Sequence, residues 1–212
     1  MRAKILVTTS HRPTQRVRSF IKDLASVLPE AIKLNRGKSS LRDLYYDAMA
    51  YGATRIVIVT VWKGNPGKML VYQPLEPPDV GLKLIASYLI RGVKLRREVP
   101  GSKKLQSTTK LAIDLTSINS ERLRMLADTI SRSFLARMVF DPDELEHFNV
   151  VLELEEAGST IVLKFISPRD NRVCGPIIRI QGVRDYVSGF SISGGEARGS
   201  ETSTSDLQST SR

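Results

Sequence analysis

Hydroxyl and basic side chains gather near the start of the chain, in the stretch ILVTTSHRPTQRVRSFIKDLASVLPEAIKLNRGK of residues 5–38. Guanidinium forks match phosphate oxygens, and ammonium and hydroxyl groups donate to them at close range. Eight residues of this stretch form our predicted binding set: Thr9, Ser10, Arg12, Arg16, Arg18, Lys22, Arg36 and Lys38. The chemistry that they suggest is phosphate recognition.

The elements around these residues should bring them together. An apolar run predicts a strand over residues 4–7, and a helix begins at Pro13 and Thr14, with apolar residues on one face. A second strand, 31–35, leads to Arg36 and Lys38. In a parallel β-α-β unit both strand ends lie at one edge, so these donors should converge. A solvated surface is the alternative, but positive charge at a helix start opposes the helix dipole and favours an anionic partner.

The charge of the chain supports a polyanionic partner. The 212 residues include 32 Lys and Arg against 22 Asp and Glu, a net charge of +10. Residues 1–110 hold 21 basic and 7 acidic residues, a net of +14, whereas residues 111–212 hold 11 and 15, a net of −4. The N-terminal half therefore favours a negatively charged partner, which is usually nucleic acid. The acidic residues 141–156 are a solvated face or a docking surface for a basic protein.

Few residues suggest catalysis, metal binding or export. Cys174 is the single cysteine, so an internal disulfide is excluded, and a small buried hydrophobe is its expected role. His11 and His147 have no evident catalytic partners, and we expect no cofactor and no metal. No signal peptide and no apolar run of the roughly 18–20 residues that span a bilayer are apparent. We expect a cytoplasmic protein that contacts no membrane.

Two further features each have two interpretations. The loop from Gly64 to Lys68 resembles part of a phosphate loop but lacks the Walker spacing, so we predict a hairpin with a type II turn at Asn65-Pro66-Gly67. Trp62 and Tyr72 lie on the two strands of this hairpin. They can form a platform on which bases stack, or pack in the core, which is the commoner role of aromatic side chains.

The remaining pattern predicts an α/β chain with mixed sheets. We expect helices over 41–51 and from Ser120 until Asp141-Pro142-Asp143 breaks the second one, and an extended basic segment over 94–100. Residues 80–90 are ambiguous between a buried helix and a strand, and we favour the strand. Further strands are expected over 55–62, 68–73, 111–115, 148–155, 160–166, 176–181 and 186–192. A shift of 106 residues superimposes the first strand–helix pattern on the second, which suggests an internal repeat. The expected divisions are 1–102, 103–193 and a disordered tail, 194–212.

The N-terminal motifs resemble a known family. They are the Thr8-Thr9-Ser10 cluster, Arg12-Pro13-Thr14, Arg16-x-Arg18, Asn35-Arg36-Gly37, the strand Ile56–Val59, and Gly64-x-Pro66. Together they resemble the Brix domain of ribosome-biogenesis proteins, in the branch that acts in the small-subunit processome. The resemblance is dense over residues 4–75 and weak after about residue 110. The chain looks like the minimal archaeal form of the family.

This resemblance implies a function and a fold. It implies a non-catalytic factor that binds ribosomal RNA in pre-rRNA processing and subunit assembly, with other assembly proteins as partners of the acidic half. It also implies two similar α/β halves, each like the anticodon-binding domain of class II aminoacyl-tRNA synthetases. The alternative is a protein-interaction scaffold without RNA affinity. A nuclease or phosphotransferase is disfavoured, because the seven carboxylates of the basic half form no D-x-D or E-x-K cluster.

Overall fold

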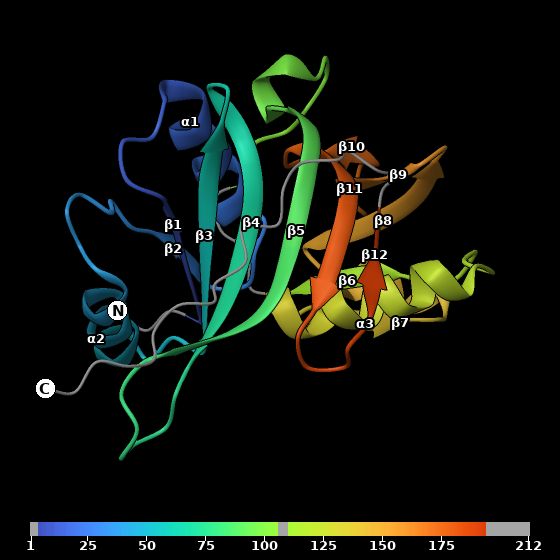
Figure 1. The fold of residues 1–212 in the computed structure, drawn as a ribbon. Helices are drawn as coiled ribbons and strands as arrows, with labels where there is room; N and C mark the ends of the chain where they lie inside the picture. Colours follow the sequence, from blue (N-terminus) through green and yellow to red (C-terminus); the bar gives the residue numbers. More distant parts are fainter. Residues whose placement is uncertain (1–3, 106–109, 194–212) are drawn as a thin grey trace, which may run out of the picture.

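A computed structural model describes residues 4–105 and 110–193 of the chain. Its centre is one twelve-stranded sheet in the order β2-β1-β3-β4-β5-β11-β9-β8-β6-β7, with β10 beside β9 and β12 beside β11 (Figure 1). The strands are β1 Ile5–Thr9, β2 Ala31–Lys33, β3 Arg55–Trp62, β4 Asn65–Pro74, β5 Leu82–Lys94, β6 Leu111–Asp114, β7 Arg137–Val139, β8 Val150–Ala157, β9 Thr160–Ser167, β10 Arg172–Val173, β11 Ile177–Asp185 and β12 Ser191–Ile192. The helices are α1 Gln15–Ala25, α2 Leu41–Tyr51 and α3 Glu121–Phe134, with 3₁₀ turns η1 Arg96–Glu98 and η2 Pro142–His147.

Parallel and antiparallel strand pairs are mixed in this sheet. β1 lies parallel to β2 and β3, and β3, β4 and β5 continue as an antiparallel meander. β6 likewise lies parallel to β7 and β8, and β8, β9 and β11 continue antiparallel. The antiparallel β5–β11 pair joins the two parts. The predicted mixed α/β class is therefore confirmed.

One face of the sheet carries the main core. α1 and α3 bury their apolar faces there, and side chains from both parts of the sheet meet in a single cluster. Phe20 of α1 and Phe134 of α3 are both completely buried in it. Burial of such side chains stabilises the fold by roughly 1.5–3 kcal/mol each. The two helices are consequently fixed with their polar sides outward.

α2 packs on the opposite face, at the β1–β3 end of the sheet. Leu44 and Ala48 contact Leu6, Ile56 and Ile58 in a separate cluster. Ser40 caps this helix in a reciprocal capping box with Asp43, and Gly52 ends it in the left-handed region at φ 68°. Its bounds, Leu41–Tyr51, are those that the sequence predicts, because both ends carry strong local signals.

The predicted type II turn at Asn65-Pro66-Gly67 is wrong. The chain reverses at Lys63 and Gly64, whose φ angles of 45° and 80° are both left-handed, and Asn65 already pairs with Trp62. Two consecutive left-handed residues give the twist that a two-residue hairpin requires. Pro66 is tolerated in β4 because the register with β3 shifts beside it, between Val59 and Val61.

Several other boundaries also differ from the predictions. Residues 94–100 are not extended throughout, because η1 folds over Arg96–Glu98. α3 ends at the left-handed Leu135, and the short β7 follows at once. Residues 186–190 form a turn instead of part of one strand, because β11 runs to Asp185 and only Ser191–Ile192 pairs back to it. The predicted tail, 194–212, lies outside the described residues.

Candidate nucleic-acid interface

The loops after β1 and β2 meet at one edge of the sheet, as the parallel pairing requires. The Thr8 hydroxyl donates to the Leu34 carbonyl at 3.1 Å, and His11 Nδ1 lies 3.1 Å from the Gly37 carbonyl. Since a carbonyl only accepts, the proton of His11 is on Nδ1 in this contact. The hydroxyl-rich loop and the Arg36 turn therefore adjoin, and the predicted convergence of the two strand ends is confirmed.

Between these loops and α1 lies a hollow that we call the rim hollow. Its lining comes from β1, the following loop, α1 and the end of β2: Thr9, Arg12, Pro13, Arg18, Ile21, Lys33, Leu34, Asn35, Arg36 and Gly37. Four of the ten are basic, and none is acidic. Such a lining favours an anionic ligand.

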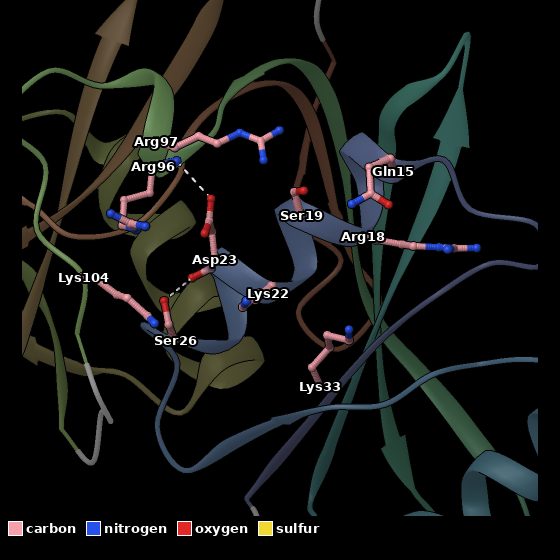
Figure 2. Close-up of a pocket in the computed structure, with 10 residues that line it drawn as sticks. All are labelled: Gln15, Arg18, Ser19, Lys22, Asp23, Ser26, Lys33, Arg96, Arg97 and Lys104. Atoms are coloured by element: carbon pink, nitrogen blue, oxygen red, sulfur yellow. Dashed lines mark hydrogen bonds between the residues drawn. The ribbon is translucent and has the colours of Figure 1, made fainter.

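A second hollow, the helix hollow, lies along the outer side of α1 (Figure 2). Its lining comes from α1, β2, η1 and the segment after η1: Gln15, Arg18, Ser19, Lys22, Asp23, Ser26, Lys33, Arg96, Arg97 and Lys104. Arg18 and Lys33 line both hollows, so the two adjoin. The seven Lys and Arg that line them, apart from the largely buried Arg36, form what we call the basic surface: Arg12, Arg18, Lys22, Lys33, Arg96, Arg97 and Lys104.

Two contacts hold η1 against α1. Arg16 donates to both carboxylate oxygens of Glu98, at 2.5 and 2.9 Å, and to the Val93 carbonyl at 3.0 Å. Asp23 accepts from the backbone N–H of Arg96 at 3.0 Å (Figure 2). The hydrogen bond from Arg16 is the main cause of the lowered pKa of Glu98. These contacts place Arg96 and Arg97 beside the outer side of α1.

Few acidic side chains neutralise the cations of the basic surface. Among the described residues, no ion pair involves Arg12, Arg18, Lys22 or Lys33. All four side chains are exposed. Asp23 is the single carboxylate in the helix-hollow lining, and it already accepts a backbone N–H. Cations without partners remain available to an external anion.

Comparison with known proteins places the chain in a family, although no protein-family model matches the sequence. A Brix domain-containing ribosomal biogenesis protein of Saccharolobus solfataricus, so named as probable, is 37% identical over 141 residues, which cover 63% of this chain and 82% of that protein. The crystal structure of a probable ribosomal biogenesis protein from Aeropyrum pernix K1 is 32% identical, covers 84% of this chain and 95% of its own, and superimposes with a TM-score of 0.72.

The chain belongs to the Brix domain-containing ribosomal biogenesis proteins. A family member from Thermococcus kodakarensis is 45% identical over 95 residues, which cover 45% of this chain and 44% of that protein. The chain thus matches less than half the length of that relative. An archaeal Imp4-like protein shares the fold at 19% identity and a TM-score of 0.61.

In this Brix-family chain, the eight residues predicted to bind RNA fall into three groups. Arg12, Arg18 and Lys22 are exposed on the basic surface, and Lys38 is exposed just beyond it. Arg16 is engaged by Glu98. The structure therefore places three of the eight predicted residues on the basic surface and a fourth, Lys38, next to it.

Three other members of the predicted set have structural surroundings that limit contact. Thr9 is 2% exposed at the end of β1, and Ser10 is half-buried, with its backbone N–H donating to the Val59 carbonyl at 2.8 Å. Arg36 is 9% exposed and donates through Nε to the Ser39 carbonyl at 2.9 Å. Burial lowers the pKa of Arg36. Arg36 therefore shapes the turn after β2.

Four basic residues of the surface were not in the predicted set: Lys33, Arg96, Arg97 and Lys104. The sequence does mark residues 94–100 as basic, but nothing local indicates that η1 folds back on α1. The contact depends on Arg16 and Glu98, which are 82 positions apart. Only the tertiary structure could have added Arg96, Arg97 and Lys104, whereas Lys33 lies on β2, within the N-terminal stretch that the sequence already marks as basic.

The other candidate residues have ordinary surroundings. Cys174 is buried, and burial raises the pKa of its thiol to about 12. Within residues 4–105 and 110–193, no group of three or more His, Cys, Asp and Glu side chains is placed to hold a metal ion. In the same residues, no helix is long and apolar enough to cross a membrane. In the acidic segment, Glu144, Glu155 and Glu156 each pair with a basic side chain.

Proposed function

We propose that the chain is a non-catalytic ribosome-biogenesis factor that binds ribosomal RNA through the basic surface around α1. The observation that carries the proposal is the pair of adjoining hollows, whose exposed cations have no ion-pair partners among the described residues. The names of the relatives, ribosomal biogenesis proteins, support the same process. Pre-rRNA processing and subunit assembly are the steps that we propose.

The chemistry of the surface suits the RNA backbone. Arg12 and Arg18 offer planar forks that pair with phosphate oxygens, whereas Lys22 and Lys33 act as point charges. Since Arg18 and Lys33 line both hollows, successive phosphates can follow one path from the rim hollow to the helix hollow. Binding of this kind releases counterions and is therefore steeply salt-dependent.

The test compares two double variants in binding to ribosomal RNA fragments across a salt series. Arg18→Gln/Lys22→Gln removes two free cations from the basic surface. We expect an affinity loss of at least about tenfold at low salt, and a slope of log affinity against log salt that is shallower by roughly 1.4–1.8. Unchanged affinity and slope would contradict the assignment of this surface.

The matched control is Arg122→Gln/Arg124→Gln on α3. It removes the same charge from the helix that follows β6, where Arg122 pairs with Glu156 at 3.8 Å and Arg124 donates to the Ile118 carbonyl at 3.3 Å. Affinity and slope should stay close to those of the unmodified chain. An equal loss in both variants would show that net charge, and not this surface, drives binding.

A protein-interaction scaffold without RNA affinity is the second candidate. It is favoured by the outer face of α2, where Leu41, Tyr46 and Met49 are 45%, 49% and 40% exposed. The acidic segment of the C-terminal part is a further candidate surface for assembly proteins. Recovery of protein partners after nuclease treatment, together with no direct RNA binding at low salt, would favour this function over the first.

We also propose that the chain is an internal repeat with a division near residue 102. The support is the matching order of pairings: a strand parallel to two neighbours, followed by an antiparallel meander, on each side of the β5–β11 pair. Each part would then resemble the anticodon-binding domain of class II aminoacyl-tRNA synthetases. Because both parts share the main core, neither should fold stably when it is expressed alone.

A further inference from the structure

Trp62 is the single tryptophan of the chain, and its ring lies largely in solvent. At 68% exposure it is the most exposed large apolar side chain of the described residues. The core packing expected for it is therefore wrong, whereas Tyr72 is half-buried against the α2 cluster. Aromatic rings carry a large apolar surface that is usually covered by the fold or by a ligand.

The backbone under Trp62 is held in place. Trp62 pairs with Asn65 across the two-residue turn, at the tip of the β3–β4 hairpin. Gly67 lies directly beneath the side chain, since a Cβ built there would lie 2.6 Å from the Trp62 Cβ. The absence of a side chain at Gly67 thus makes room for the Cβ and the backbone of Trp62. Trp62 thus lies at the tip of a paired β-hairpin, β3–β4, which we call the Trp62 hairpin.

The Trp62 hairpin contacts the start of α1, next to the basic surface. The Thr14 hydroxyl, which caps α1, also donates to the Gly64 carbonyl of the hairpin tip at 2.7 Å. Arg12 of the rim hollow lies two residues before Thr14. Figure 1 shows the β3–β4 turn at the same end of the molecule as the start of α1. An RNA strand on the basic surface would therefore pass close to Trp62.

The charge around the ring favours RNA over a protein partner. Lys63 Nζ lies 5.9 Å from the centroid of the Trp62 ring, and Lys68 is exposed on β4. The sequence between Asp47 and Glu76 contains no acidic residue. A flat aromatic ring bordered by cations matches a nucleobase and its phosphate, and stacking of this kind tolerates every base.

We propose that Trp62 stacks against an unpaired nucleobase of the bound RNA. This inference rests on the proposed function and deepens it, because it makes a single-stranded segment the ligand. Bases within a duplex already stack on each other and present no free face to a side chain. The basic surface would hold the phosphates, and Trp62 would distinguish unpaired from paired RNA.

The single tryptophan makes its own fluorescence the readout. The unmodified chain is titrated with a single-stranded RNA of about 12 nucleotides, with its blunt duplex, and with an abasic strand of the same length. We expect quenching by the base-bearing single strand and little change with the other two. Trp62→Ala has no tryptophan, so its binding is measured with fluorescently labelled RNA. It should bind the base-bearing single strand roughly 5- to 150-fold more weakly than the unmodified chain does, and the abasic strand with unchanged affinity.

Two further variants sharpen the test. Trp62→Phe should restore part of the affinity, because a smaller ring still stacks. Phe140→Ala removes an aromatic side chain of similar exposure, 67%, from the C-terminal part and should change nothing. Both positions are exposed, so neither variant should prevent folding.

The failures of the two proposals are distinguishable. Equal affinity of the unmodified chain for base-bearing and abasic strands, or an unchanged affinity in Trp62→Ala, would overturn the stacking site while RNA binding by the basic surface stands. That outcome would assign the exposed ring to a protein contact instead. Absence of binding to all three RNAs at low salt would overturn the proposed function itself.

Discussion

α1 and α3 occupy equivalent places in the sheet but use their charges differently. Each follows a strand that is parallel to both of its neighbours, and each packs against the same core. On α3, Arg122 pairs with Glu156, and Arg132 pairs with Asp128 and Asp185. On α1, Arg18 and Lys22 have no ion-pair partner among the described residues. Arg122 and Arg132 of α3 are therefore neutralised within the protein, whereas Arg18 and Lys22 of α1 are not in the part that the structure describes.

The two helices are also anchored by different means. α3 is held by buried polar contacts: the Asp185 carboxylate accepts from Arg132 and, at 3.0 Å, from the Thr129 hydroxyl. α1 is held by its apolar face, by the Thr14 cap and by the half-exposed Arg16–Glu98 pair. The polar contacts that anchor α1 are thus partly exposed, whereas those that anchor α3 centre on the buried Asp185.

The largest effect should come from Asp185→Ala. Asp185 is 2% exposed, and its carboxylate accepts hydrogen bonds from the Arg132 guanidinium and from the hydroxyls of Thr129 and Ser188. The substitution would remove the acceptor of all three hydrogen bonds. Removal of one partner of a fully buried charged pair costs about 3–5 kcal/mol, and because the Arg132 side chain is 33% exposed we expect a loss at the lower end of that range. Urea unfolding should show this loss as a lower midpoint.

Asp128→Ala is the control for that variant. It removes the second carboxylate that pairs with Arg132, but from the surface of α3, where the Asp128 side chain is 48% exposed. Pairs of this helical spacing contribute only about 0.3–0.5 kcal/mol. If the two variants lost equal stability, the buried contacts would not be what anchors α3.

Local signals explain which parts of the fold the sequence predicts well. α2 has a Ser40–Asp43 capping box and a left-handed Gly52, and both its bounds are predicted correctly. β7 has three residues and η2 is a 3₁₀ turn, and neither was predicted. Strands this short are fixed by their neighbours, here by the parallel pairing of β7 with β6.

The basic surface was predictable only in part, for a similar reason. Arg12 lies in the loop before α1, and Arg18 and Lys22 lie on α1, so all three are close in the sequence and their grouping is local. The contribution of η1 depends on contacts such as that between Asp23 and Arg96, 73 positions apart. The ion pair between Arg16 and Glu98 also depends on the packing of η1 against α1. The sequence therefore could not show that, within the described part of the chain, Arg16 is paired whereas Arg12 and Arg18 are not.

A pH series tests the same difference between the helices. Burial is the largest influence on the Asp185 carboxyl and would raise its pKa, but hydrogen bonds from Val187, Ser188 and Arg132 outweigh it and lower the pKa from 3.8 to about 2. A lowered pKa stabilises the fold above the unfolded value, and this contribution disappears as the pH falls through the folded value. The free energy of unfolding of the unmodified chain and of Asp185→Asn is measured at about pH 7, 4 and 2.5. The difference between the two proteins should shrink by roughly 2 kcal/mol, mainly below about pH 4. A constant difference would contradict the lowered pKa.

The smallest effect is expected at the helix starts. Thr14 accepts from the Val17 N–H and donates to Gly64, so Thr14→Ala should destabilise the chain by about 1 kcal/mol. Ser120 occupies the same position on α3, but its side chain makes no cap bond and contacts Glu156 instead, at 3.3 Å. Ser120→Ala should therefore change stability by less than about 0.5 kcal/mol in the same urea titration. Equal losses would mean that Thr14 matters only as a helix former, and the bond from Thr14 to the Trp62 hairpin would then contribute nothing to its position.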